Sequence, residues 1–301
     1  MADRSRVIST GNDNKHTSRL VKAFQSLDNL KDFSQTPSGV WGSTATIKCG
    51  DVTIKSSELD FEFDIPFDDD LESNEGEIIV YNLSDNTIKQ LKKGSKLSIQ
   101  AGYKGDTGVI FMGRITKART HHDEVDKITT IKIIDDIENK ESINRSFGAG
   151  TKASYILRTL LGLTDFPIAV FDVASDYVYA SGETVNEPIE SAIKKYSEVC
   201  GVNAFLSNGS WYCFKQNGED NAFRFVVSES TGMIGSPSPF EETGSESETV
   251  EGFEIEMLLQ HRMVAGALIN LSSQHYSGTY HVKSGTHRFN DGEAVTTIKV
   301  V

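Results

Sequence analysis

Three histidines near the C-terminus come closest to the spacing of a metal site. His275, His281 and His287 recur at even intervals in a strand-rich region, so one unbroken strand would place all three on the same face. Gly278 and Gly285 interrupt this stretch and favour turns, which would separate the histidines. The sequence therefore predicts no metal site here.

Two further polar clusters have explanations that need no ligand. His121 and His122 are adjacent, so on a strand their side chains point to opposite faces and do not readily share one metal ion; an exposed hairpin tip is predicted. The acidic run of Asp68, Asp69 and Asp70 lacks the ligand pattern and central glycine of an EF-hand. We interpret this run as a solvated loop.

The motifs of common enzyme classes are absent. The sequence contains no GxSxG nucleophile elbow, Walker loop, HExxH pair or dinucleotide-binding fingerprint. Glycoside hydrolysis needs only two carboxylates that the fold brings together, and no pair among the 43 acidic residues stands out. We therefore expect a protein that is not an enzyme and has no catalytic residue, no metal ligand and no cofactor.

The amino-acid composition limits the classes of partner that the protein is expected to bind. The 301 residues carry 30 Lys and Arg against 43 Asp and Glu, a formal net charge of −13, which argues against gripping nucleic acid through clustered cations. An acidic lumen that DNA merely passes is compatible with this charge, because like charges prevent sticking. Neither a membrane-spanning run nor a signal peptide is present, so no membrane insertion is expected. Cys49, Cys200 and Cys213 show no CxxC spacing and are predicted to be buried free thiols.

The pattern of residues 42–140 predicts a first antiparallel β barrel. Glycines separate runs that alternate apolar and polar residues, and a hairpin is expected around Gly50 and Asp51. In LDFEFDIPF, Leu59, Phe61 and Phe63 lie on one face and charges on the other. One buried and one solvated face are typical of a barrel or sandwich.

Residues 141–215 change to a helical period and predict a smaller α+β domain. One helix is expected after Gly150, with Thr151 as its cap, and a second after Asn186, with Pro188 in its first turn. A hairpin follows with Asn208 and Gly209 as its tight turn. The aromatic residues of its second strand, in SWYCF, are interpreted as core.

Residues 216–301 predict a second β barrel, with a flexible Ser-, Gly- and Glu-rich loop near 236–251. No repeat is obvious in the sequence, although two β domains around an α+β domain would fit a duplicated fold. Residues 1–41 are predicted to be a polar arm with one short amphipathic helix, whose Leu20, Phe24 and Leu27 are candidates for binding a partner.

The order of several short motifs resembles that of baseplate hub proteins in the tails of long-tailed phages and prophages. The motifs are YNLS, KKG, AGYKGD and IFMGRI in the first barrel, then INRSFGAG, TGMIGSPSP and SGTYHVKSGTHRF. The resemblance covers roughly residues 45 to 301. It implies a mainly β, α+β protein with two tail-tube-like antiparallel β-barrel domains flanking a smaller α+β domain.

The resemblance also implies a function and partners. A homotrimer would form a pseudo-sixfold ring that joins the hexameric tail tube to the tail tip, spike or fibre. Distal tail or other baseplate proteins and the tape measure protein would be neighbours, and double-stranded DNA would pass through the lumen. The protein would be assembled in the cytoplasm of the host bacterium and reside in the virion tail. The alternative is a tail-associated cell-wall hydrolase or carbohydrate-binding module.

Overall fold

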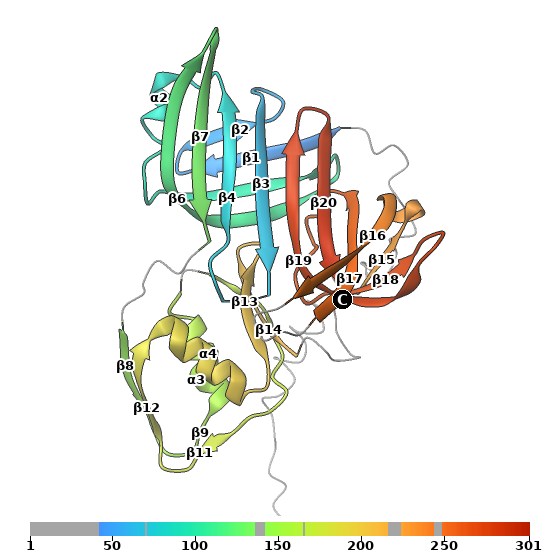
Figure 1. The fold of residues 1–301 in the computed structure, drawn as a ribbon. Coiled ribbons are helices and arrows are strands. Elements are labelled where there is room, and N and C mark those ends of the chain that lie inside the picture. The colour runs from blue at the N-terminus through green and yellow to red at the C-terminus, as the bar shows by residue number, and fades with distance from the viewer. Residues whose placement is uncertain (1–41, 70, 136–141, 165, 216–223, 244–248) are drawn as a thin grey trace, which may run out of the picture.

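The computed structural model describes residues 42–69, 71–135, 142–164, 166–215, 224–243 and 249–301. Two β barrels lie side by side and share strands of one large sheet, and a smaller α+β domain lies beneath them in the view of Figure 1. The fold class predicted from the sequence is confirmed. The predicted arm, with Leu20, Phe24 and Leu27, lies outside the described residues.

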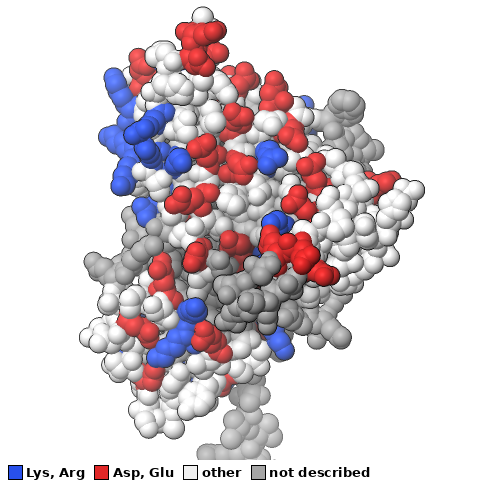
Figure 2. All heavy atoms as spheres, in the orientation of Figure 1, with Lys and Arg blue, Asp and Glu red and all other residues white. Residues whose placement is uncertain are grey.

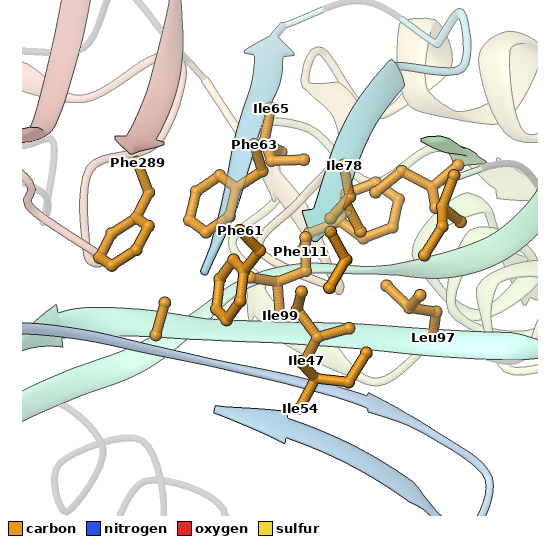
Figure 3. Packing of buried hydrophobic residues seen from close by; sticks show 14 of the residues in the cluster. Ile47, Ile54, Phe61, Phe63, Ile65, Ile78, Leu97, Ile99, Phe111 and Phe289 are labelled. Atoms are coloured by element: carbon orange, nitrogen blue, oxygen red, sulfur yellow. The ribbon is translucent and has the colours of Figure 1, made fainter. Parts of the chain in front are cut away.

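Barrel one forms because its strands alternate apolar and polar residues. In the third strand Phe61, Phe63, Ile65 and Phe67 are buried, and the residues between them face outward. Figure 3 shows the first three of these side chains meeting residues from the facing strands in the core. The elements of barrel one are β1 (Ser43–Cys49), β2 (Val52–Lys55), β3 (Phe61–Asp68), β4 (Glu75–Tyr81), α2 (Asp85–Ile88), β5 (Lys96–Tyr103), β6 (Asp106–Asp123) and β7 (Asp126–Ile134).

The middle domain packs two helices against three small sheets. Helix α3 begins at Ala153, but the predicted Thr151 cap is wrong, because the Thr151 hydroxyl donates to the Gly148 carbonyl. The Asp176 carboxylate instead accepts from the backbone N–H of Ser154 at 3.0 Å. The elements are β8 (Ser142–Phe147), β9 (Thr151–Lys152), α3 (Ala153–Leu161), β10 (Ile168–Phe171), β11 (Val178–Tyr179), β12 (Glu183–Pro188), α4 (Ile189–Val199), β13 (Asn203–Ser207) and β14 (Ser210–Phe214).

Barrel two differs from the sequence prediction at two places. Strand β19 runs unbroken through Gly278 and Gly285, because both glycines remain paired in the sheet and do not turn the chain. The stretch predicted as a flexible loop, 236–251, largely forms the paired strands β16 and β17. The elements are β15 (Arg224–Ser228), the 3₁₀ turn η2 (Glu229–Thr231), β16 (Met233–Thr243), β17 (Thr249–Leu258), β18 (Leu268–Ser272), β19 (Ser277–Asn290) and β20 (Glu293–Val300).

The hairpin of β13 and β14 joins the middle domain to both barrels. Phe205 and Phe214 pack into the core of barrel two, whereas Trp211 packs into the core of the middle domain. The predicted turn residues Asn208 and Gly209 both have positive φ angles, 50° and 69°. The Asn208 side chain donates to the His261 carbonyl at 2.9 Å. The turn therefore fixes the junction of the three parts.

A buried carboxyl lies where β7 leaves barrel one. Asp135 accepts hydrogen bonds from the backbone N–H of Asn74 at 2.6 Å and from its side-chain amide at 3.2 Å. Burial raises the pKa of Asp135 to about 7; the bonds from Asn74 oppose this rise, and the nearby Asp68 carboxylate adds to it. The three cysteines are free and buried, as predicted.

Replacing Gly209 by Ala tests the junction. A methyl group there would overlap Met112 of barrel one, and the positive φ adds strain. We expect a loss of about 1 kcal/mol from the left-handed backbone and a further 1 to 3 kcal/mol from overpacking, measured by urea unfolding. Gly235→Ala is the matched control, because Gly235 has φ +67° and open space around it. Equal losses in both variants would contradict a tightly packed junction.

Replacing Asp135 by Asn tests the buried carboxyl. Between about pH 4, near the usual pKa of an unfolded Asp, and the folded pKa of about 7, the folded state holds a proton that the unfolded state has lost. This proton stabilises the wild type at low pH, and the stabilisation is lost as the pH rises toward 7. Asp135→Asn should flatten this part of the stability profile in urea unfolding at several pH values. Parallel profiles for wild type and Asp135→Asn would refute the assignment.

Candidate assembly interface

The two barrels repeat one strand arrangement. Four strands follow the order β3-β4-β7-β6 in barrel one and β16-β17-β20-β19 in barrel two. Each outer hairpin, β6–β7 and β19–β20, contains a β-bulge, which follows Ile115 in the first and Val282 in the second. Eight positions separate the bulge from the last paired residue in both, at Asp123 and Asn290. The duplicated fold suggested by the domain order is thus visible in the strand register.

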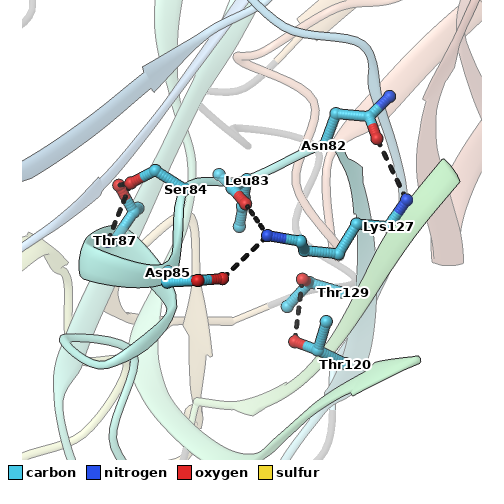
Figure 4. Close-up of polar contacts among 8 residues, drawn as sticks. All are labelled: Asn82, Leu83, Ser84, Asp85, Thr87, Thr120, Lys127 and Thr129. Carbon is cyan, nitrogen blue, oxygen red and sulfur yellow. Dashed lines mark hydrogen bonds and ion pairs between the residues drawn. The ribbon is translucent and has the colours of Figure 1, made fainter. Parts of the chain in front are cut away.

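The equivalence extends to single hydrogen bonds. Thr129 and Thr296 occupy corresponding positions on β7 and β20, and both are fully buried. Thr129 shares a hydrogen bond of 3.0 Å with the hydroxyl of Thr120 on β6 (Figure 4), and Thr296 shares one of 2.9 Å with Nδ1 of His287 on β19. Thr120 is therefore the counterpart of His287.

The barrels meet in a paired seam between β19 and β3. His287 is the partner of Ile65, is fully buried, and stacks on Phe67 with ring centroids 4.8 Å apart. Burial lowers the pKa of His287 to about 3, so the ring is neutral at physiological pH. Phe289 stacks against Phe61 and Phe63, as Figure 3 shows. The seam therefore contributes side chains to the cores of both barrels.

A second contact joins the barrels at the turn between β5 and β6. Arg262 donates to both oxygens of Asp106, at 2.9 and 2.5 Å, and holds the pKa of that carboxyl below its usual range. His261 packs so closely on Gly108 that a side chain there would overlap its ring. Burial lowers the pKa of His261 to about 4, so its ring is also neutral.

Charged residues form a row across the outward face of the shared sheet. Lys132, Glu77, Asp64 and Arg288 are successive register partners on β7, β4, β3 and β19. The two outer pairs form ion pairs, Lys132 with Glu77 at 3.8 Å and Arg288 with Asp64 at 3.5 Å. We call this row the charge ladder.

Acidic residues are widespread on the same side of the molecule. Figure 2 shows Asp and Glu spread over the front of both barrels, while Lys and Arg gather at the upper left margin, near α2 and β6. A polar hollow of about 450 Å³ lies at the end of the seam, and Asp60, Glu62, Asp126 and Asp291 contribute to its lining. This side could accordingly face a polyanion without binding it tightly.

Several edges of the long sheet are unpaired among the described residues, those of β2 and β15 included, and two of them lie at the ends of the run β16-β17-β20-β19-β3-β4-β7-β6 that the two duplicated units form. The half of β6 after its bulge pairs with β7 on one side only, because the pairing of β5 ends at Arg114. Strand β16 pairs with β17 on one side only. Unpaired edges of this kind are sites at which a further strand can be added.

The residues considered as ligands from the sequence do not form a site. His121 and His122 lie exposed near the β6–β7 tip, as predicted. His281 and His287 share strand β19, yet His287 is occupied with Thr296. No group of three or more His, Cys, Asp or Glu suited to a metal ion occurs among the described residues, and no described helix is both long and apolar enough to cross a membrane.

Sequence reasoning missed the residues that join the barrels. The Asp106–Arg262 pair spans 156 positions, and nothing local marks either residue. The equal spacing of the two outer hairpins could have been found in the sequence, since both contain a two-residue turn and their second strands are alike: residues 128–134 read ITTIKII and residues 295–301 read VTTIKVV. The duplication is therefore visible in hairpin length, in register and in this short repeat.

Comparison with known proteins identifies the fold. No protein-family model and no curated protein sequence matches this chain. A 43 kDa tail protein of prophage MuSo2 from Shewanella oneidensis aligns with 86% of this chain and 97% of its own length, at 9% identity and a TM-score of 0.62. A tail protein from Neisseria meningitidis MC58 covers 86% of this chain and 96% of its own, at 10% identity and a TM-score of 0.59.

A secretion protein has the same architecture. The Escherichia coli c3393 protein, a component of the type VI secretion system described as similar to the bacteriophage T4 tail proteins gp27 and gp5, aligns with 85% of this chain and 76% of its own. Its identity is 9% and its TM-score 0.58. At such low identity the shared property is the fold. The protein therefore has the fold of phage-type tail proteins, which confirms at this level the resemblance to baseplate hubs that its sequence motifs indicate.

Proposed function

We propose that this protein is a structural hub component in the baseplate of a phage or phage-like tail. The observation that carries the proposal is the pair of duplicated four-strand units, joined in one run of eight strands that has an unpaired edge at each end, on β16 and on the part of β6 after its bulge. Three copies would supply six barrels, which match the six subunits of a tail tube ring. The trimer would then act as an adaptor between the hexameric tube and a threefold tip, spike or fibre.

Closing the ring explains the unpaired edges. Barrel one of each copy would lie against barrel two of the next, so that every β6 and β16 edge gains a neighbour. Head-to-tail contacts of this type form closed rings when the rotation between copies closes. The tail tube protein, the tape measure protein and distal tail or other baseplate proteins would be the remaining partners within the virion tail.

The polar groups with shifted pKa values have structural explanations. Asp106 is held by Arg262, the His287 ring is enclosed by Phe67 and Thr296, and Asp135 is bonded to Asn74. Each of these side chains is thus engaged in a contact that holds strands or barrels together. We therefore propose a protein without catalytic activity of its own; cell-wall hydrolysis by the pure chain, lost on replacing one carboxylate or histidine, would refute this.

The outward face of the shared sheet is proposed to line the DNA channel. Acidic residues on it would repel phosphate, and the cations of the charge ladder are engaged with carboxylates, Lys132 with Glu77 and Arg288 with Asp64. Each phosphate that a free cation neutralises adds salt-dependent affinity, which would retard the passage of the genome. An acidic face keeps the channel free of such binding.

Mass measurement tests the ring. We expect native mass spectrometry to detect a trimer with the tail tube protein present. Deleting residues 1–35 should leave the body folded but impair this assembly, because the arm, through Leu20, Phe24 and Leu27, is proposed to dock on a neighbouring subunit or tail protein. A head-to-head dimer or six non-equivalent copies would contradict the ring, and unchanged assembly of the shortened chain would contradict the role of the arm.

Duplex binding tests the channel face. The wild type should not retard a DNA duplex at physiological salt in a gel-shift assay. Replacing Asp64 and Glu77 together by Lys should create salt-sensitive binding, because it turns the charge ladder into four adjacent cations. The control is the same change at Asp51 and Glu58, which are exposed on other elements. Tight duplex binding by the wild type would overturn the proposal.

A further inference from the structure

We infer that β6 of one copy lies beside β16 of the next copy in the register that β19 and β3 adopt within the chain. The inference rests on the proposed ring and specifies its contact. It uses the internal seam as a template: β19 is the counterpart of β6, and β3 is the counterpart of β16. Each copy would thus repeat between chains the seam that it already contains.

The correspondence of β3 with β16 follows from their partners. The backbone N–H of Tyr81, on β4, donates to the Asp60 carbonyl at 3.0 Å, and that of Leu258, on β17, donates to the Gly232 carbonyl at 2.9 Å. Asp60 directly precedes β3, and Gly232 directly precedes β16. The two strands therefore enter their barrels at the same point.

The register along the two strands is fixed by the inner strands. Phe61 pairs with Val80, and Met233 pairs with Met257, at the start of each strand. Further along, Asp64 pairs with Glu77, and Ser238 pairs with Glu254. A bulge between Ile234 and Ser238 adds two residues to β16, so Ser238 takes the place of Asp64.

The exposure of Thr120 on β6, compared with the burial of His287 on β19, shows that the β6 edge lacks a covering strand. His287 is fully buried because β3 covers β19 and places Phe67 against its ring. Its counterpart Thr120 makes the equivalent bond to a buried threonine, yet is exposed, since no described strand lies beside that part of β6. A strand in the position of β3 would cover Thr120. The structural counterpart of β3 is β16, and within one chain β16 lies at the opposite end of the sheet.

Transferring the internal register gives specific neighbours. In this register His121 would lie opposite Ser238, as Arg288 lies opposite Asp64. Arg119 would lie opposite Phe240, as Thr286 lies opposite Pro66. Lys117 would lie opposite Glu242, as Ser284 lies opposite Asp68. The last pair places Lys117 beside Glu242, a carboxylate that Lys283 and Lys299 of its own chain already contact. The second places a guanidinium beside an aromatic ring, a favourable arrangement. The side chains are thus compatible with this register.

Proline limits the hydrogen bonds of this seam. Pro239 takes the place of Ile65 and has no N–H to donate, so the contact between copies would carry fewer ladder bonds than the internal seam. Prolines on an edge strand also oppose unselective pairing with other chains. The contact would consequently depend on side chains and on closure of the ring.

Disulfide trapping tests the register. The double variant His121→Cys, Ser238→Cys introduces two cysteines at exposed positions, whereas the native cysteines are buried. Opposed residues on antiparallel strands have Cα atoms about 5 Å apart, within the range of a disulfide. We expect covalent dimers and trimers on non-reducing gels after mild oxidation of the assembled protein.

The matched control is Lys117→Cys with Ser238→Cys. Lys117 is exposed on the same edge but four residues from His121, about 13 Å along the strand, and should give no covalent trimer. Equal trapping in both variants, or a trimer by mass without trapping in the first, would overturn the seam and leave the ring intact. A protein that stays monomeric with its tube protein would overturn the ring, and the seam with it.

Discussion

The pairing of β19 with β3 is the constraint on which the rest of this structure depends. Because the two strands are register partners, each barrel contributes to the core of the other: Phe289 of barrel two packs in the core of barrel one, and Phe67 of barrel one packs in the core of barrel two. The neutral His287 ring is enclosed between Phe67 and Thr296, so separating the barrels would expose aromatic surface and the imidazole together. The barrels therefore behave as one sheet, and their relative angle is set by strand geometry.

That constraint determines how charge can be placed on the outward face. Asp64 and Glu77 are direct cross-strand partners of like charge, an arrangement that weakens a sheet. Arg288 and Lys132 flank them in the same row and offset the repulsion. Ion pairs exposed in this way contribute little stability each, about 1 kcal/mol or less. Their arrangement therefore fits the proposed repulsion of phosphate by this face better than a role in stability.

Much of the fold was predictable, and the reason is local. Alternation identified β3, and the Asn-Gly turn identified the hairpin of β13 and β14, because each signal resides in a few consecutive residues. Strand β19 was misjudged because Gly278 and Gly285 favour turns locally while pairing on the sheet keeps them extended. The prediction of a flexible loop near 236–251 was wrong for a similar reason. The composition of this stretch is polar, but most of its described residues pair in the β16–β17 hairpin. The joints between barrels depend on residues far apart in sequence, which no local signal connects.

The duplicated barrels also indicate which features such a fold retains. Side chains at some corresponding positions have diverged, as Thr120 and His287 show, whereas bulge position, hairpin length and the Thr-Thr-Ile-Lys run that begins at Thr129 and at Thr296 are the same. A bulge re-aims the strand beyond it, and a one-residue slip would move every later side chain to the other face. The buried Thr129 and Thr296 each keep a bonded partner, because an unpaired buried hydroxyl is costly. Backbone register, the Thr-Thr-Ile-Lys run and satisfied buried hydroxyls are thus common to both halves. A contact between two barrels has to preserve this register, whether the barrels lie in one chain or in two.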